Sequence, residues 1–229
     1  QGVGMAYAVG GRGDHSFNDS AARGMDKAAK EFGLGNKEQT ASNDETESDR
    51  EQRLDLLAGG GYNPVIAVGY TYGDAVAKMA KKYPKVTFGL VDSVVDSPNV
   101  DSMVFATEQS SYLAGVAAAL KTKTGKVGFI GGVHNTLIGT FDAGFAQGVK
   151  DTDPKVQLTR QYLYETDARG FNDPAAATGK AKGMLDKGID VIYTAAGLSG
   201  DGSIQTVAAK PGTWAIGVDS DQYQDPALA

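Results

Sequence analysis

The chain of 229 residues contains no cysteine and only two histidines, His15 and His134. The lack of cysteine excludes disulfide bonds, thiolate metal sites and a cysteine nucleophile. Neither histidine has a second histidine or a glutamate at helical metal-binding spacing, so we expect no metal site and no cofactor. With cysteine absent and histidine scarce, catalysis would have to rest on carboxylates, and because nothing in the sequence pairs them convincingly, we do not expect an enzyme.

Long apolar runs and an excess of basic residues are missing as well. No apolar run approaches the roughly 18 residues of a membrane-spanning helix. The chain has 22 basic and 28 acidic residues, for a net charge of −6. This balance argues against a nucleic-acid-binding protein, which normally carries a basic stripe. The chain begins at Gln1 without a methionine, and we interpret it as a trimmed mature product whose anchoring segment has been removed.

Short apolar runs alternate with helical patterns along the whole chain. Such alternation predicts βαβ units, and the continuous apolar character of the runs predicts parallel strands covered on both faces. We expect strands over residues 3–9, 39–42, 65–69, 86–91, 100–106, 126–130, 156–164, 191–194 and 214–218, and helices over residues 18–32, 48–58, 73–82, 111–120, 137–150, 174–187 and 203–209.

One pair of consecutive strands lacks a helix between its members. The expected strands 86–91 and 100–106 are joined only by residues 92–99, near the midpoint of the chain. Such a break suits a crossover between two domains, so we place a hinge near residues 105–109. The expected division is an N-terminal α/β lobe over 1–107, a C-terminal α/β lobe over 108–218, and a return of 219–229 toward the first lobe.

The segments that follow the strands are rich in aromatic, amide and carboxylate side chains and poor in basic ones. Ligands of open α/β sheets bind beyond the carboxyl ends of the strands. Carboxylates accept hydrogen bonds from hydroxyls and aromatic rings stack on flat groups, so these ends favour a neutral, hydroxylated, partly planar ligand over a phosphate. The alternative is that each such residue is an ordinary turn or cap former. Phe17 and Phe171 each stand beside a cap residue, one in each expected lobe, and could clamp a ring.

Five blocks of sequence, in order, resemble one known family. Residues 10–18 match the pattern Gly-Gly-x-x-Asp-x-Ser-Phe-Asn, and further matches cover residues 91–96, 108–115, 170–175 and 216–222. The chain thus resembles the basic membrane protein family, also called the purine nucleoside receptor-like (PnrA-like) family of substrate-binding lipoproteins of ABC transporters. The resemblance covers nearly the whole chain. One departure from the family pattern lies near the end of the first strand, where the family commonly has an aspartate and this chain has Tyr7 and Ala8.

The resemblance implies an α/β protein with the type I periplasmic-binding-protein fold, two Rossmann-like lobes joined by a hinge. It implies an extracytoplasmic receptor that binds a nucleoside, usually a purine, in the interlobe cleft and delivers it to the membrane permease of an ABC importer. The receptor would be a monomer, lipid-anchored through a removed N-terminal segment, with no nucleic-acid partner. The fold also serves ligand-sensing domains of regulators or receptors, which remain the alternative, and an enzyme acting on nucleosides is a third.

The resemblance also assigns roles to individual residues. Phe17 and Phe171 would sandwich the base, and Asp219 would accept hydrogen bonds from the ribose hydroxyls. The other expected ligand-binding residues are Asp14, Asn18, Tyr70, Asp92 and Gly197.

Overall fold

The computed structural model describes residues 2–226 and 228 and divides the chain into two compact units. Unit 1 comprises Gln1–Asp14 and Asn18–Phe105, and unit 2 comprises His15–Phe17 and Ala106–Ala229. The boundary thus lies two residues before the expected one. Residues 219–226 and 228 group with unit 2.

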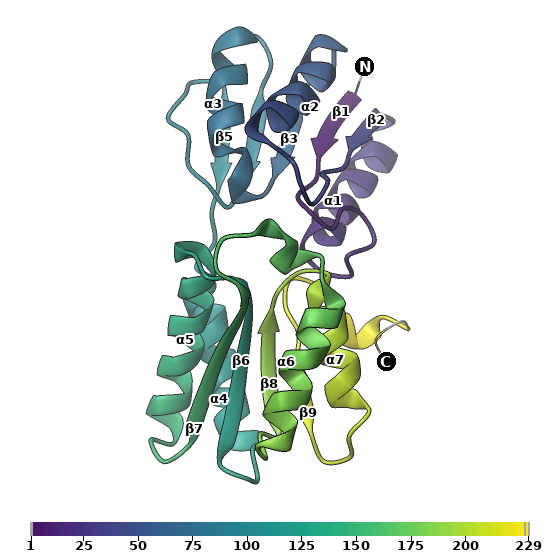
Figure 1. Ribbon diagram of the computed structural model, residues 1–229. Coiled ribbons are helices and arrows are strands. Elements are labelled where there is room, and N and C mark those ends of the chain that lie inside the picture. The colour runs from purple at the N-terminus through teal and green to yellow at the C-terminus, as the bar shows by residue number, and fades with distance from the viewer. Residues whose placement is uncertain (1, 227, 229) are drawn as a thin grey trace. The chain divides into compact units, whose positions relative to one another are not determined.

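Unit 1 is built on a five-stranded sheet in which every neighbouring pair of strands is parallel, in the order β2-β1-β3-β4-β5 (Figure 1). Its strands are β1 (Gly2–Ala6), β2 (Gly35–Gln39), β3 (Val65–Val68), β4 (Phe88–Val91) and β5 (Val100–Met103). Its helices are α1 (Phe17–Phe32), α2 (Glu47–Gly59), α3 (Gly73–Lys82) and the short 3₁₀ helix η1 (Tyr70–Tyr72).

The core of unit 1 forms where α2 and α3 pack on the sheet. Leu57 of α2 and Val76 of α3 are buried with Val65, Phe88 and other strand residues in one cluster. Leucines and valines at helical spacing give each helix an apolar stripe, and burying such a stripe contributes about 1.5–3 kcal/mol per large side chain. This packing holds the strands in register and thereby fixes where each strand ends.

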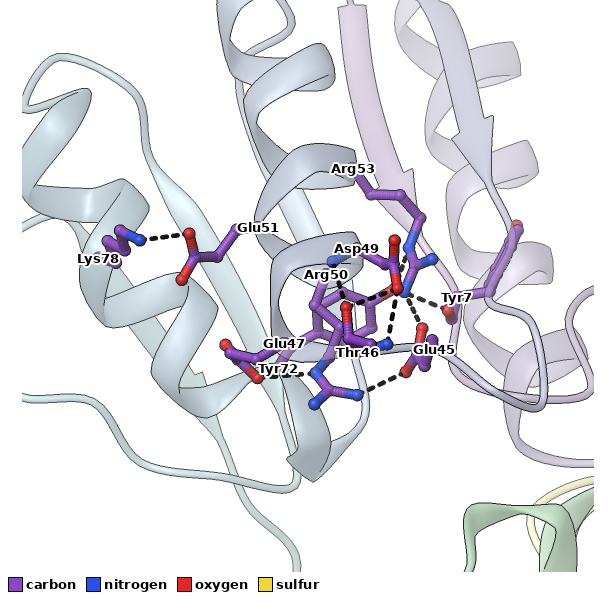
Figure 2. A network of polar contacts seen from close by, with 10 residues as sticks. All are labelled: Tyr7, Glu45, Thr46, Glu47, Asp49, Arg50, Glu51, Arg53, Tyr72 and Lys78. Atoms are coloured by element: carbon purple, nitrogen blue, oxygen red, sulfur yellow. Dashed lines mark hydrogen bonds and ion pairs between the residues drawn. The ribbon is translucent and has the colours of Figure 1, made fainter.

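A local sequence signal explains where α2 begins. α2 starts with a capping box: Thr46 Oγ1 accepts from the Asp49 amide, and the Asp49 carboxylate accepts from the Thr46 amide at 2.7 Å (Figure 2). The prediction of a strand over residues 39–42 was wrong. β2 lies at Gly35–Gln39, with its first three residues exposed at the edge of the sheet. A polar edge strand carries no apolar run, so the pattern could not mark it.

Unit 2 is built on a four-stranded parallel sheet in the order β7-β6-β8-β9 (Figure 1). Its strands are β6 (Lys126–Val133), β7 (Gln157–Tyr164), β8 (Val191–Ala195) and β9 (Trp214–Ile216). Its helices are α4 (Thr107–Lys121), α5 (Thr136–Thr152), α6 (Pro174–Asp186) and α7 (Ser199–Ala208), with 3₁₀ helices η2 (Ala168–Phe171) and η3 (Gln222–Gln224).

Both faces of the second sheet are buried. Phe129 of β6 and Tyr193 of β8 pack with α4 and α5, while their neighbours Ile130 and Ile192 pack with α6 on the opposite face. Successive side chains of a strand point to opposite faces, so a strand covered on both sides must be apolar throughout. This explains why β6 and β8 read as continuous apolar runs in the sequence.

Because each sheet is parallel, the carboxyl ends of its strands meet at one edge. In the sheet of unit 1 this edge carries the segments that follow β1, β3 and β4, and in the sheet of unit 2 it carries the segments that follow β7, β8 and β9. Every residue predicted to bind the ligand lies in a segment that follows a strand. Within the described part of the chain, no helix combines the length and apolar character needed to cross a membrane.

Candidate functional site

The backbone is strained in three of the segments that follow strands. Among the described residues, the non-glycine residues with positive φ are His15 (53°), Asp92 (65°) and Asp219 (64°). The left-handed region costs an L-residue roughly 1–2 kcal/mol, and such conformations cluster at functional sites. Asp92 directly follows β4, Asp219 follows β9, and His15 lies in the loop between β1 and α1, so the strain falls in segments that the sequence singled out.

Asp92 follows β4 directly and is half-buried. Its amide donates to Met103 O at 2.9 Å, which fixes the backbone there. Burial raises the pKa of the carboxyl to about 6. Within the residues that the structure describes, the carboxylate has no hydrogen-bond or ion-pair partner. A desolvated carboxylate without a partner gains by accepting hydrogen bonds from a ligand.

Tyr70 begins η1, immediately after Gly69, whose φ of 115° suits glycine and disfavours other residues. β3 and β4 are neighbours in the sheet, with Val68 paired to Val91. The segments that carry Tyr70 and Asp92 therefore leave from adjacent strand ends. Unit 1 thus carries an aromatic residue and a hydrogen-bond acceptor at neighbouring strand ends.

Asp14 and Asn18 are buried, each with about 1% of its surface exposed. The Asp14 carboxylate accepts from the Asn18 amide at 2.8 Å, from Asn18 Nδ2 at 2.9 Å and from the Asp19 amide at 3.0 Å, which caps α1. Asn18 Oδ1 accepts from the Ala8 amide at 3.0 Å. These two side chains hold the loop between β1 and α1 in its folded conformation.

Arg12 is a residue of this loop that the sequence did not single out. Its guanidinium binds both oxygens of Asp26 on α1, at 2.8 and 2.9 Å, and also Glu38 of β2 at 3.0 Å. Hydrogen bonds from Arg12 hold the pKa of the Asp26 carboxyl below its usual range. Because the three residues are far apart in the sequence, only the fold reveals this anchor.

The segment His15–Phe17 belongs to unit 2, although both of its flanks belong to unit 1. Ser16 Oγ donates to Asp219 Oδ2 at 2.7 Å, and Ser220 Oγ donates to Ser16 O at 2.8 Å. His15 Nδ1 lies 2.7 Å from Asp201 Oδ2 of α7. Asp219 is thus placed with the segment that carries Phe17, in the same unit as Phe171, whereas the sequence predicted one aromatic in each lobe.

Phe171 ends η2 and packs, half-buried, against the core of unit 2. Glycines give it room: a Cβ atom on Gly132 of β6 would lie 2.7 Å from its ring, and one on Gly197 would lie 3.3 Å from its carbonyl oxygen. Gly197 follows β8 and has a φ of 54°. Unit 2 therefore sets Phe171 against the ends of β6 and β8.

The site carries no grouping suited to metal chemistry. Among the described residues, no cluster of three or more His, Asp or Glu side chains is arranged to hold a metal ion. What the two units offer at their strand ends is aromatic rings, carboxylates and glycine-lined backbone. These groups bind by stacking and hydrogen bonding.

The chain matches the family model of ABC transporter substrate-binding proteins of the PnrA-like type over residues 2–227. It is 36% identical over 232 residues to the CD4+ T-cell-stimulating antigen of Listeria monocytogenes, covering 97% of the chain and 64% of that protein. It is 37% identical over 221 residues to the ABC transporter nucleoside-binding protein BmpA of Lactococcus lactis, covering 93% and 62%.

A solved structure agrees with these relatives. The fold superposes on an ABC transporter solute-binding protein of Aeropyrum pernix with a TM-score of 0.86 and 30% identity, covering 99% of this chain and 65% of that one. The chain thus spans just under two thirds of the length of each of these three proteins. It has the fold of the type I periplasmic solute-binding proteins and belongs to the PnrA-like family of ABC transporter substrate-binding proteins.

Proposed function

We propose that the protein is an extracytoplasmic receptor of an ABC importer and that it binds a nucleoside, with purines preferred. One observation carries the proposal: the three strained non-glycine residues, His15, Asp92 and Asp219, all lie in segments that follow strand ends. Backbone strain of this kind persists where the surrounding structure enforces the conformation, and it clusters at active sites and ligand-binding sites. The printed function of the Lactococcus lactis relative supports the ligand class.

The chemistry of the side chains fits the parts of a nucleoside. Phe17 and Phe171 would stack on the base, since base–aromatic stacking contributes about 1–3 kcal/mol per ring. Asp219 would accept hydrogen bonds from the ribose hydroxyls. Asp92 would accept from a further donor of the ligand, because its carboxylate is desolvated and has no partner among the described residues.

The remaining predicted residues would shape the site. Tyr70 and Gly197 would line it, Tyr70 with its ring and Gly197 with exposed backbone. Asp14 and Asn18 would contribute by holding the loop that precedes α1, since their polar groups are already engaged there. None of the proposed residues is basic, which disfavours a phosphorylated ligand.

The mechanism that suits such a receptor is closure on the ligand. Ligand would bind first to the groups of unit 2, which carries both Phe17 and Phe171, and would then be enclosed as the chain moves at its hinge. The permease would recognise the closed form. As parts of this proposal, the receptor is a monomer, has no nucleic-acid partner and is held at the membrane by a lipid on a segment upstream of residue 1.

A thermal-shift screen tests the ligand class. The panel contains inosine, adenosine, guanosine, uridine, adenine, ribose and inosine monophosphate. A ligand that binds only the folded state adds about 2.7 kcal/mol of stability at a hundredfold excess over its Kd. We expect a shift with purine nucleosides, a smaller one with uridine, and none with ribose or the nucleotide. A shift with ribose alone, or with the nucleotide above all, would contradict the proposal.

A further inference from the structure

A buried polar network lies beside the strand ends of unit 1 and includes none of the residues proposed to contact the ligand (Figure 2). It joins Tyr7, which follows β1, with Glu45 in the loop between β2 and α2, Arg53 of α2, and Tyr72 of η1. The network therefore connects the segments that follow three strands, β1, β2 and β3. Tyr70, two residues before Tyr72, belongs to the same short helix as the network.

Tyr72 is the centre of the network. Its side chain is fully buried, and its hydroxyl donates to the Tyr7 backbone oxygen at 2.9 Å while accepting from Arg53 Nε at 3.0 Å. Burial raises the pKa of the Tyr72 hydroxyl, so the group keeps the proton that it donates. With its donor and an acceptor position both occupied, the hydroxyl fixes the distance between η1 and the end of β1.

Arg53 is itself held from two sides. Its guanidinium forms an ion pair with Glu45 and lies 5.6 Å from the centre of the Tyr72 ring. The side chain of Glu45 is 3% exposed and that of Arg53 is 11% exposed. Glu45 also accepts from Arg50 at 3.0 Å. The charges are therefore shielded from water and paired, and the planar guanidinium has one orientation that satisfies all its partners.

Stability alone is a poor reason for such a network. Removing two charges from water costs about as much as their attraction returns, and apolar residues of similar volume are often equally stabilising. Buried ionic groups that are fully hydrogen-bonded do specify a single local geometry. Here the network specifies the geometry of η1, whose last residue is Tyr72, relative to the end of β1.

We propose that Arg53 and Tyr72 are positioning residues, which orient Tyr70 and the end of β1 for ligand binding without contacting the ligand. The expected effect on affinity rests on the proposed function, whereas the expected effect on the local backbone does not. Glu45 serves the network by anchoring Arg53.

The substitution Tyr72→Phe removes the hydroxyl and keeps the ring. In the full chain, we expect inosine affinity measured by calorimetry to fall about three- to tenfold, the range of one lost hydrogen bond. We also expect amide hydrogen exchange over residues 69–73 to become faster without ligand. Tyr83→Phe is the matched control. The Tyr83 hydroxyl donates to Asp55 at 2.7 Å and likewise ties α2 to the α3 region, but at the opposite end of α3 from η1.

The pair of variants separates positioning from general destabilisation. Unchanged inosine affinity and unchanged exchange in Tyr72→Phe would overturn the proposal, and so would equal losses of affinity in both variants. Arg53→Lys should restore part of the affinity that Arg53→Met loses, because it keeps a charged donor near Tyr72. If the unaltered chain binds no inosine, the proposed function fails, and the exchange over residues 69–73 alone decides the positioning role.

Discussion

Replacing Asp92 by asparagine should change the pH dependence of stability in a defined direction. Burial disfavours the charged form of the carboxyl and raises its pKa to about 6 in the folded chain. An unfolded aspartate titrates near 3.9, so the folded state binds the proton more tightly. The stability that this gives is fully present below about pH 3.9 and is lost as pH rises through about 6.

The magnitude follows from the difference between the two pKa values. A difference of about two units corresponds to a ceiling of about 3 kcal/mol, since one unit is about 1.4 kcal/mol. Asp92 is only half-buried, so solvent screening reduces this to about 1–2 kcal/mol. Asparagine accepts a positive φ as readily as aspartate and does not titrate. Between pH 4 and pH 7, the free energy of unfolding of the variant should therefore fall by about 1–2 kcal/mol less than that of the unaltered chain.

Urea denaturation across this pH range provides the measurement. Asp96→Asn is the matched control, because Asp96 lies in the same connecting segment but is exposed. The free energy of unfolding of each variant is plotted against pH and compared with that of the unaltered chain. The slope of this plot decides the question, whereas the absolute free energy does not. Parallel curves for Asp92→Asn and the unaltered chain would refute the argument that Asp92 is a desolvated carboxylate.

Two further substitutions test the site and the packing. Phe17→Ala should weaken inosine binding by about 1–3 kcal/mol in calorimetry, whereas Phe32→Ala, at the exposed end of the same helix, should leave it unchanged; equal Kd values for the two would contradict stacking on Phe17. Gly148→Ala should destabilise by about 1–3 kcal/mol in thermal unfolding, because its Cβ would lie 2.0 Å from Tyr112 O. Gly139→Ala on the same helix meets no atom within 4 Å and should be neutral or stabilising, so equal melting temperatures would refute the close contact of α4 and α5.

Elements with strong local signals could be predicted from the sequence. α6 was expected from residue 174 and begins there, because Pro174 suits the first turn and Asp173 caps it, accepting from the Ala176 amide at 2.9 Å. β8 was expected over residues 191–194 and spans Val191–Ala195, since an apolar run between turn residues marks a strand buried on both faces.

Elements whose boundaries depend on tertiary packing could not be predicted from the sequence. α7 was expected from residue 203 but begins at Ser199. The run Ser199–Gly202 has poor helix propensity, yet it is buried, and a Cβ on Gly202 would lie 2.0 Å from Pro174 O. The close packing of α6 and α7 therefore requires small residues, and packing overrides propensity there. α4 likewise begins at Thr107, before its expected start, with no side-chain cap to mark it.

Some features of the candidate site could likewise be predicted from the sequence, and others could not. Asp92 and Asp219 could be proposed because they follow strands, a position defined by the chain itself. The backbone strain at these two residues could not be predicted, because a positive φ at aspartate has no sequence signature. The links from Tyr72 to Tyr7 and to Arg53 span 65 and 19 positions of sequence, so only the folded sheet shows that they meet.

Binding of a purine nucleoside by stacking and by carboxylate acceptors is tested most directly by calorimetry, with inosine and inosine monophosphate titrated into the same preparation. We expect a saturable single-site isotherm for inosine and none for the nucleotide, because a phosphate would meet no basic side chain among the proposed residues. A cooperatively folded chain that shows no heat of binding with inosine, adenosine or guanosine at millimolar concentration would contradict the claim, and so would tighter binding of the nucleotide.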